Sequence, residues 1–133
     1  ISKIHFYFKI LHDFIFDYFI DILRFKNRTE VNSKQIIPAD YIKKSITPAH
    51  YLTDSKTHKA VDFYGYQWWI MNYNGKQVPY ARGILGQYIF IIPEDNAIIV
   101  RLGHKRSRNY INHHPTDTYS YLNTAERILN ARK

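Results

Sequence analysis

The chain has 133 residues, which is enough for one domain or for part of a larger one. Hydrophobic residues make up 45% and charged residues 23%, a globular composition that excludes a disordered chain. The formal net charge of +8 allows attraction to nucleic acid, anionic lipid or acidic ligands, and the absence of cysteine excludes disulfides, zinc–thiolate sites and cysteine nucleophiles.

The first 25 residues are apolar and have helical spacing. Phe6, Ile10 and Phe14 lie opposite the main apolar stripe, so the predicted helix is apolar all round and needs a partner to bury it. Charged residues at positions 9, 13, 17 and 21 argue against a signal peptide and against a membrane span. The chain begins at Ile1 without a methionine, which suggests a fragment or a processed product. The main stripe consists of Ile4, Phe8, Leu11, Ile15, Phe19 and Ile22.

A polar connection over residues 24–35 leads to a short predicted helix from Ala39 to Ser45. Thr47 precedes Pro48, and a residue before proline is disfavoured in a helix, so the helix is expected to end there. The polar stretch from His50 to Ala60 predicts an exposed loop.

Residues 64–102 have the pattern of an antiparallel meander. The aromatic segment 64–73 predicts a strand, and Asn74-Gly75 predicts a tight hairpin turn because both positions of that turn need positive φ. A return strand is expected from Lys76 to Arg82. The apolar runs 87–92 and 97–102 are short and flank a turn at 93–96, which predicts two further strands.

The last predicted elements are a basic surface loop from His104 to Pro115 and a helix from Asp117 to Ala131, capped by Thr116 or Asp117. The helix has an apolar stripe formed by Leu122, Ala125, Ile128 and Leu129. The predicted fold class is α+β, an antiparallel meander with a C-terminal helix packed on it and a helical N-terminal region. We expect one partial domain over 1–133, with helices and loops in 1–60 and the sheet and last helix in 61–133.

Several kinds of site lack their sequence patterns. The seven histidines show no metal-ligand spacing, and the adjacent pair His113-His114 is expected to be solvated, so neither a metal nor a cofactor is predicted. Gly83 and Gly86 lie between strands, which does not fit a dinucleotide loop. The basic cluster 104–108 has Tyr110 nearby, but no nucleic-acid motif frames it and no nucleic-acid partner is expected.

Four segments, taken together, resemble the C-terminal part of the serine β-lactamase-related hydrolases, the group of class C β-lactamases, penicillin-binding-protein-like proteins and esterases. The resemblance spans residues 17–129 and is densest from 64 to 103. Upstream, 17–23 and 34–41 are similar to the helical segments that precede the family's sheet. The segments are Tyr64-Gly65-Tyr66-Gln67-Trp68-Trp69-Ile70, Ala81-Arg82-Gly83-Ile84-Leu85-Gly86-Gln87-Tyr88, Phe90-Ile91-Ile92-Pro93-Glu94 and Ile98-Ile99-Val100.

The resemblance implies a partial β-lactamase/transpeptidase-like fold, an extracytoplasmic location and a parent that hydrolyses a small amide or ester through an acyl-serine. Ala81-Arg82-Gly83 corresponds to the family's third motif, although Ala81 replaces its usual cationic or imidazole side chain. Gly83 would allow close approach of a substrate, and the Ile84 backbone N–H corresponds to an oxyanion donor. The Ser-x-x-Lys and Tyr-x-Asn motifs that supply the nucleophile and the proton-handling groups have no counterpart here, so the chain alone is expected to be inactive.

Arg82 ends its predicted strand and is expected to meet a carboxylate of a substrate or partner, or else Glu94, Asp95 or solvent. The alternative function is a non-catalytic basic binding or interaction module, suggested by Ala81 and by the net charge of +8. Exposed apolar surface is expected to make the chain marginally stable and prone to self-association.

Overall fold

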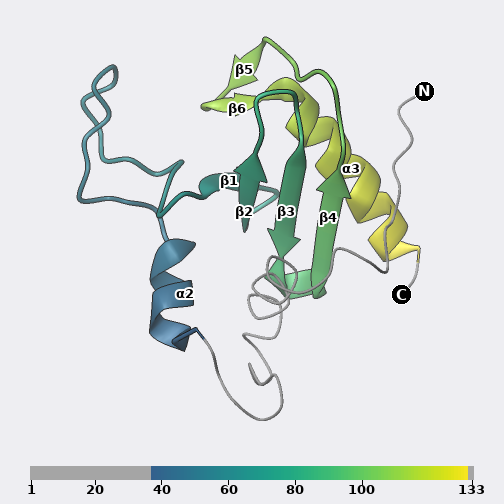
Figure 1. The fold of residues 1–133 in the computed structure, drawn as a ribbon, viewed down its shortest axis with the longest axis horizontal. Coiled ribbons are helices and arrows are strands. Elements are labelled where there is room, and N and C mark those ends of the chain that lie inside the picture. The colour runs from purple at the N-terminus through teal and green to yellow at the C-terminus, as the bar shows by residue number, and fades with distance from the viewer. Residues whose placement is uncertain (1–36, 132–133) are drawn as a thin grey trace.

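The computed structural model describes residues 37–131. Within them a four-stranded antiparallel sheet has the order β1-β2-β3-β4, followed by a two-stranded β5-β6 pair and the C-terminal helix α3 (Figure 1). The predicted α+β meander with a C-terminal helix is therefore confirmed. The predicted N-terminal helix and the connection 24–35 lie outside the described residues. The main-sheet strands are β1 (Trp69–Tyr73), β2 (Lys76–Arg82), β3 (Tyr88–Ile92) and β4 (Ala97–Arg101).

The β1–β2 hairpin forms where the sequence predicts it. Asn74 and Gly75 have φ values of 50° and 77°, the positive values that this two-residue turn requires. Between β3 and β4 the chain makes a 3-10 turn, Pro93–Asp95, and Asn96 follows with a φ of 48°. These short connections keep consecutive strands adjacent in the sheet.

One difference concerns the start of β1, which is predicted at Tyr64 and observed at Trp69. Residues 64–68 form a tight loop in which the Gly65 N–H donates to Trp68 O and Gln67 has a φ of 66°. A Cβ on Gly65 would lie 2.6 Å from Thr47 O, so this loop packs closely against the end of helix α2 (Ala39–Ser45). Tertiary packing here overrides the strand propensity of the aromatic residues.

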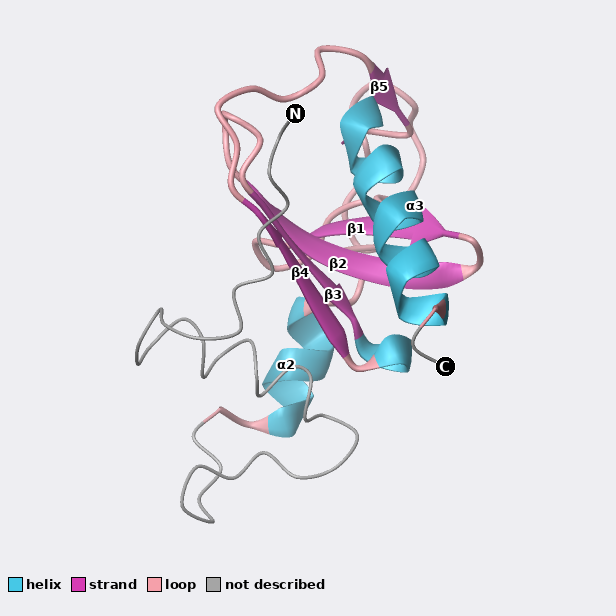
Figure 2. Ribbon diagram, turned by 90° about the vertical axis from the view of Figure 1, so that its right-hand side faces the viewer, coloured by secondary structure: helices cyan, strands magenta, loops and turns pink. Residues whose placement is uncertain are grey.

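The two faces of the sheet bury two separate apolar clusters. On one face α3 (Thr116–Asn130) contributes Leu122 and Ala125 to a core that contains Tyr80, Tyr88 and Phe90 (Figure 2). On the other face Ile42 of α2 packs with Trp68, Ile70 and Ile91. Trp69 packs with the α3 cluster and Trp68 with the α2 cluster, as the alternation of side chains along an extended chain predicts.

The segment 104–115 is not the plain surface loop that its polarity predicts. It contains β5 (Tyr110–Ile111) and β6 (His114–Pro115), joined by Asn112 and His113 with φ values of 48° and 69°. His114 and Pro115 are buried. Asn112 and His113 form the turn of a second hairpin. The basic and polar composition of the segment gives no strand signal, so the sequence does not predict this hairpin.

The start of α3 also differs from the prediction. The helix begins at Thr116 directly after Pro115, and no side chain caps it. Thr116 Oγ1 is instead 2.7 Å from Ser107 Oγ, and the Tyr88 hydroxyl donates to the Asp117 carboxylate at 3.2 Å. Both predicted caps are therefore used in contacts that hold the helix to the 107 loop and to the sheet.

Candidate functional site

The β2–β3 connection, where the resemblance places the third motif, is a tight turn of four residues. The Gly86 N–H donates to Gly83 O at 3.1 Å and closes the turn, and the Gly83 N–H donates to Gln87 O at 2.8 Å. Ile84 and Leu85 are the two central residues, and both side chains are exposed. The turn therefore projects from the end of the sheet with Ile84 at its tip.

The Ile84 backbone N–H has no hydrogen-bond acceptor within the described residues. By contrast, the Leu85 N–H next to it donates to Gln87 Oε1 at 3.2 Å. Ile84 as a residue is 79% exposed, so its amide belongs to a turn at the surface. An accessible N–H without a partner can donate to an external oxygen.

Gly83 has a packing role that the sequence does not reveal. A Cβ at this position would collide with Gln87, whose Cβ would lie 3.1 Å away and whose Oε1 would be closer still. Gln87 Nε2 also donates to Gly103 O at 2.9 Å. The space beside Gly83 is thus filled by a side chain that links the turn to the segment after β4.

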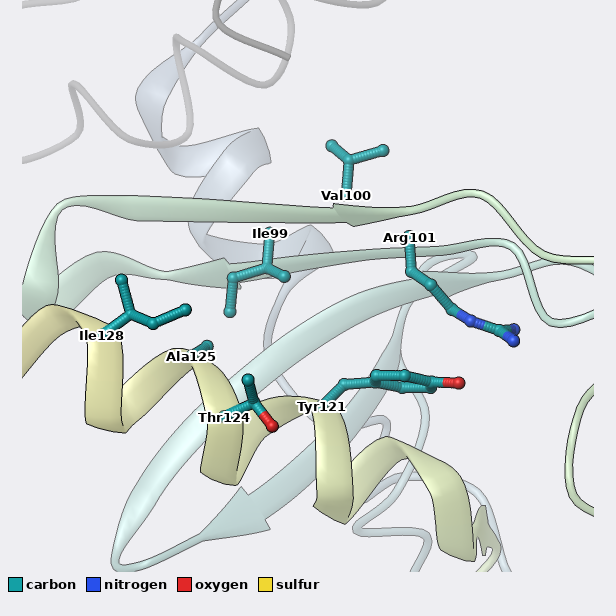
Figure 3. Close-up of a pocket in the computed structure, with 7 residues that line it drawn as sticks. All are labelled: Ile99, Val100, Arg101, Tyr121, Thr124, Ala125 and Ile128. Carbon is teal, nitrogen blue, oxygen red and sulfur yellow. The ribbon is translucent and has the colours of Figure 1, made fainter. Parts of the chain in front are cut away.

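Arg101, at the end of β4, holds the same two segments together. One of its guanidinium nitrogens donates to Gly86 O and, at 3.0 Å, to Lys105 O. The guanidinium carbon is 4.7 Å from the Tyr121 ring centre and 5.6 Å from that of Tyr88. Figure 3 shows Arg101 extending beside Tyr121, with Ile99 on the same side of β4 and Val100 on the other. The shallow groove between β4 and α3 is lined mostly by apolar groups, and its polar groups are this guanidinium and the hydroxyls of Tyr121 and Thr124.

Arg82 pairs with neither Glu94 nor Asp95, the two carboxylates of this chain expected for it. Its guanidinium carbon lies 3.3 Å from the Trp69 ring centre, and Nη1 donates to His113 O at 3.1 Å. The Tyr110 ring centre is 5.8 Å away on β5. Asp95, one expected carboxylate, pairs with Lys76 at 2.8 Å instead. Arg82 therefore joins the end of β2 to the second hairpin, because a planar guanidinium can stack on a ring and donate in its own plane.

The adjacent histidines have structural contacts and are not simply solvated, which corrects the prediction for them. His114 is buried, with Nδ1 2.9 Å from the Tyr80 hydroxyl. Burial lowers the pKa of His114 to about 4, and the nearby Arg82 charge acts in the same direction. Burial also raises the pKa of Tyr80 above its usual value. His114 is thus a neutral imidazole in a hydrogen-bonded pair.

His113 stacks on Phe63 with ring centres 3.7 Å apart, and its Nε2 is 3.6 Å from the Asp54 carboxylate. Backbone N–H groups of Thr57 and Lys56 hold the pKa of Asp54 below its usual range. Among residues 37–131 no group of three His, Asp or Glu gathers into a metal site. These contacts tie the 53–60 loop to the second hairpin.

The structure brings Arg82, Gly83 and Ile84 to one end of the sheet. Of the three, only Ile84 combines high exposure with a backbone N–H that has no acceptor among the described residues. Sequence reasoning missed Gln87, Arg101 and His114, which shape this end. The position of Arg101 could have been predicted from the sequence, because alternation along β4 places its side chain on the same face as the buried Ile99. Gln87 and His114 act through partners that are distant in the sequence, and no local pattern indicates them.

Comparison with known protein families finds none that matches this chain, and comparison with curated proteins finds no match either.

Proposed function

We propose that this chain is the C-terminal part of a β-lactamase-related serine hydrolase with the corresponding partial β-lactamase/transpeptidase-like fold. In the parent, Gly83 and Ile84, which directly follow β2, would line the reaction site. The parent hydrolyses a small amide or ester through an acyl-serine intermediate. The observation that carries the proposal is the accessible Ile84 N–H without an acceptor among the described residues, at the position where the resemblance implies an oxyanion donor.

The chemistry needs such a donor at a rigid position. Attack on a carbonyl develops negative charge on its oxygen, and a fixed N–H stabilises that charge without having to reorganise. The Gly86–Gly83 hydrogen bond, Gln87 and Arg101 fix the turn that carries the Ile84 amide. In this proposal Gly83 supports the turn, and Arg82, stacked on Trp69, is a positioning residue that does not touch substrate.

The nucleophile and its base belong to the rest of the parent, because this sequence contains no Ser-x-x-Lys. Tyr110-x-Asn112 and Tyr121-x-Asn123 follow the third motif, whereas the family's second motif precedes it. Thr118 and Leu122 are buried on α3, so the stretch around Tyr121 is occupied in packing. The chain by itself is therefore inactive in this proposal.

The test is to express the chain together with the coding sequence immediately upstream of Ile1 and to assay nitrocefin and p-nitrophenyl acetate. The expected result is turnover that disappears when the serine of an upstream Ser-x-x-Lys is replaced by alanine. Absence of such a motif in frame, or turnover by the present chain that survives replacement of each of its serines, contradicts the proposal.

Two variants of the extended protein test the amide itself. Ile84 is the second residue of the β-turn, where proline is well accommodated, so Ile84→Pro removes the N–H while the turn remains. Loss of one oxyanion donor is expected to lower kcat by about 10²- to 10³-fold. Ile84→Ala keeps the N–H and should retain kcat within a few-fold. Equal rates for the two variants would remove Ile84 from the mechanism.

A second candidate is a non-catalytic binding module. Ala81 supplies no proton-handling group at the third motif. Lys105 and Arg108 are exposed in the segment after β4, which approaches the Gly83–Gly86 turn at Lys105 O and Arg106 Cβ. Titration of a labelled single-stranded oligonucleotide at two salt concentrations tests the nucleic-acid form of this candidate. Phosphate binding weakens steeply with salt, and no saturable binding at low salt would exclude that form.

A further inference from the structure

The end of the sheet that carries the Gly83–Gly86 turn exposes a group of large apolar side chains. Ile84 is 79% exposed, Leu102 70%, Ile111 51% and Leu85 50%. We call these four residues the apolar tip. Single exposed apolar residues are common on proteins, but a group at one end of a fold marks an interaction surface.

The members of the apolar tip come from three segments that lie at the same end of the main sheet. A Cβ on Gly86 would lie 2.7 Å from Lys105 O and 3.0 Å from Arg106 Cβ, so the Gly83–Gly86 turn touches the segment after β4. The β5 hairpin joins the same end through Arg82, which donates to His113 O. Figure 1 shows the β2–β3 connection, the segment after β4 and the β5-β6 pair at one end of the molecule.

The segments that carry the apolar tip are rich in basic residues. Residues 81–88 and 101–111 contain no Asp or Glu. The guanidinium groups of Arg82 and Arg101 are held against rings and backbone carbonyls. Lys105 and Arg108 are exposed and Arg106 is half-buried. Tyr110, 45% exposed on β5, adds an aromatic ring with a polar hydroxyl. Exposed apolar side chains next to basic and tyrosine side chains complement a negatively charged lipid headgroup layer.

We propose that the apolar tip and its basic residues form a docking surface for an anionic lipid bilayer. Ile84, Leu85 and Leu102 enter the headgroup region, and Lys105 and Arg108 contact lipid phosphates. The contact is peripheral, and no helix among the described residues is long and apolar enough to cross a bilayer. Docking is proposed for the chain as it stands, and it uses the same turn that the proposed hydrolase function places in the parent's reaction site. Flotation of this chain and hydrolysis by the extended protein are separate measurements, so the failure of one proposal is distinguishable from the failure of the other.

The test is flotation of the full chain with vesicles of phosphatidylcholine and phosphatidylglycerol at 3:1, compared with pure phosphatidylcholine. Binding is expected to need the anionic lipid and to weaken as NaCl rises from 50 to 500 mM. Each basic residue near an anionic surface contributes about fivefold in affinity, so Lys105→Gln with Arg108→Gln should weaken binding by about tenfold or more. The matched control is Lys43→Gln with Lys44→Gln, which removes the same charge from exposed positions on α2.

A second pair of variants isolates the apolar contribution. Ile84→Ser with Leu102→Ser should reduce binding at least tenfold, whereas Tyr41→Ser with Tyr66→Ser, two exposed aromatic residues in and beyond α2, should not. Circular dichroism confirms that each variant is folded. Unchanged binding by the tip variants, equal binding to pure phosphatidylcholine, or binding to an oligonucleotide but not to vesicles would overturn the proposal.

Discussion

The contacts of Arg82 show how a surface-strand residue can become structural. Its guanidinium lies over the Trp69 ring and donates to His113 O, so one side chain joins β1, β2 and the second hairpin. His114, the neighbour of His113, is held by the Tyr80 hydroxyl in the same region. At this scale, the end of the sheet is organised by ring stacking and by guanidinium hydrogen bonds to backbone carbonyls, together with the neutral Tyr80–His114 pair and the Asp54–His113 pair.

Replacing Arg82 with alanine should lower the free energy of unfolding by about 1–2 kcal/mol, because the stacking contact and a hydrogen bond are lost together. Arg82→Lys should recover less than half of this loss, since an ammonium cannot stack as a plane. Urea denaturation followed by circular dichroism measures the effect. Arg108→Ala is the control, and its exposed position predicts a change within about 0.5 kcal/mol. Equal stability of the Arg82 and Arg108 variants would contradict this role.

The buried His114 predicts a stability that depends on pH. Its pKa is about 4 in the folded chain and about 6.5 in an unfolded one, so the unfolded state takes up the proton first as pH falls. The contribution of His114 is complete above pH about 6.5 and is lost progressively towards pH about 4, by up to about 3 kcal/mol. Denaturation curves from pH 7.5 to 4 measure it.

His114→Gln is the variant that isolates this effect, because an amide can hydrogen-bond to Tyr80 and does not titrate. The pH slope between about 6.5 and 4 should flatten in His114→Gln and remain in His104→Gln, which changes an exposed histidine. An unchanged slope in His114→Gln would assign the pH dependence to other groups. Asp54 affects a lower range, since its lowered pKa makes its contribution disappear only in stronger acid.

At the scale of elements, turns decide which segments meet. Gly75 and Gly86 both have positive φ, at 77° and 80°, but their surroundings differ. Nothing lies within 4 Å of a Cβ placed on Gly75, whereas one on Gly86 would press on Arg101, Lys105 and Arg106. The turn at Gly75 only reverses the chain between β1 and β2. The turn at Gly86 also forms the junction between the β2–β3 connection and the segment after β4.

Gly75→Ala should therefore cost about 1 kcal/mol, the strain of a Cβ at positive φ. Gly86→Ala adds a collision with backbone to the same strain and should cost at least about 1 kcal/mol more. Thermal or urea unfolding of the two variants gives the difference. In the extended hydrolase and in vesicle flotation, only Gly86→Ala should impair function, because only Gly86 joins the segments of the tip. Equal costs for the two glycines would show that the junction is loose.

At the scale of the molecule, β4 is one of the two edge strands of the described main sheet, and its Val100 is 37% exposed. Among the described residues no strand pairs with its outer edge. The strand contains no lysine or proline, the residues that commonly protect such edges, and Arg101 is turned towards α3 (Figure 3). An unprotected β-branched edge favours pairing between chains.

We therefore expect concentration-dependent self-association in sedimentation velocity and an unfolding midpoint below about 65 °C. Val100→Lys should reduce association by placing a charge on the edge. Asn123→Lys, on the exposed side of α3, adds the same charge elsewhere and should leave association unchanged. A monomeric wild-type chain with a cooperative transition well above this temperature contradicts the expectation.

The sequence by itself determined the meander, the face of the sheet on which alternate side chains lie, and the last helix. Period-two alternation, the Asn74-Gly75 turn and the stripe through Leu122 and Ala125 are local signals, because φ, ψ and side-chain direction depend on nearby residues. Alternation along β2 likewise accounts for Val78 and Tyr80 packing in the α3 cluster and Ala81 against the α2 cluster.

Only the tertiary structure decided what the long and titratable side chains do. Arg82 lies over Trp69, 13 positions earlier, and bonds to His113, 31 positions later. His114 is neutral because a distant strand supplies Tyr80 and removes water. The polar segment 104–115 conceals a hairpin because its buried residues are covered by neighbours outside it. The contact partners of these side chains are determined by packing between segments that are distant in the sequence, so the local sequence does not predict them.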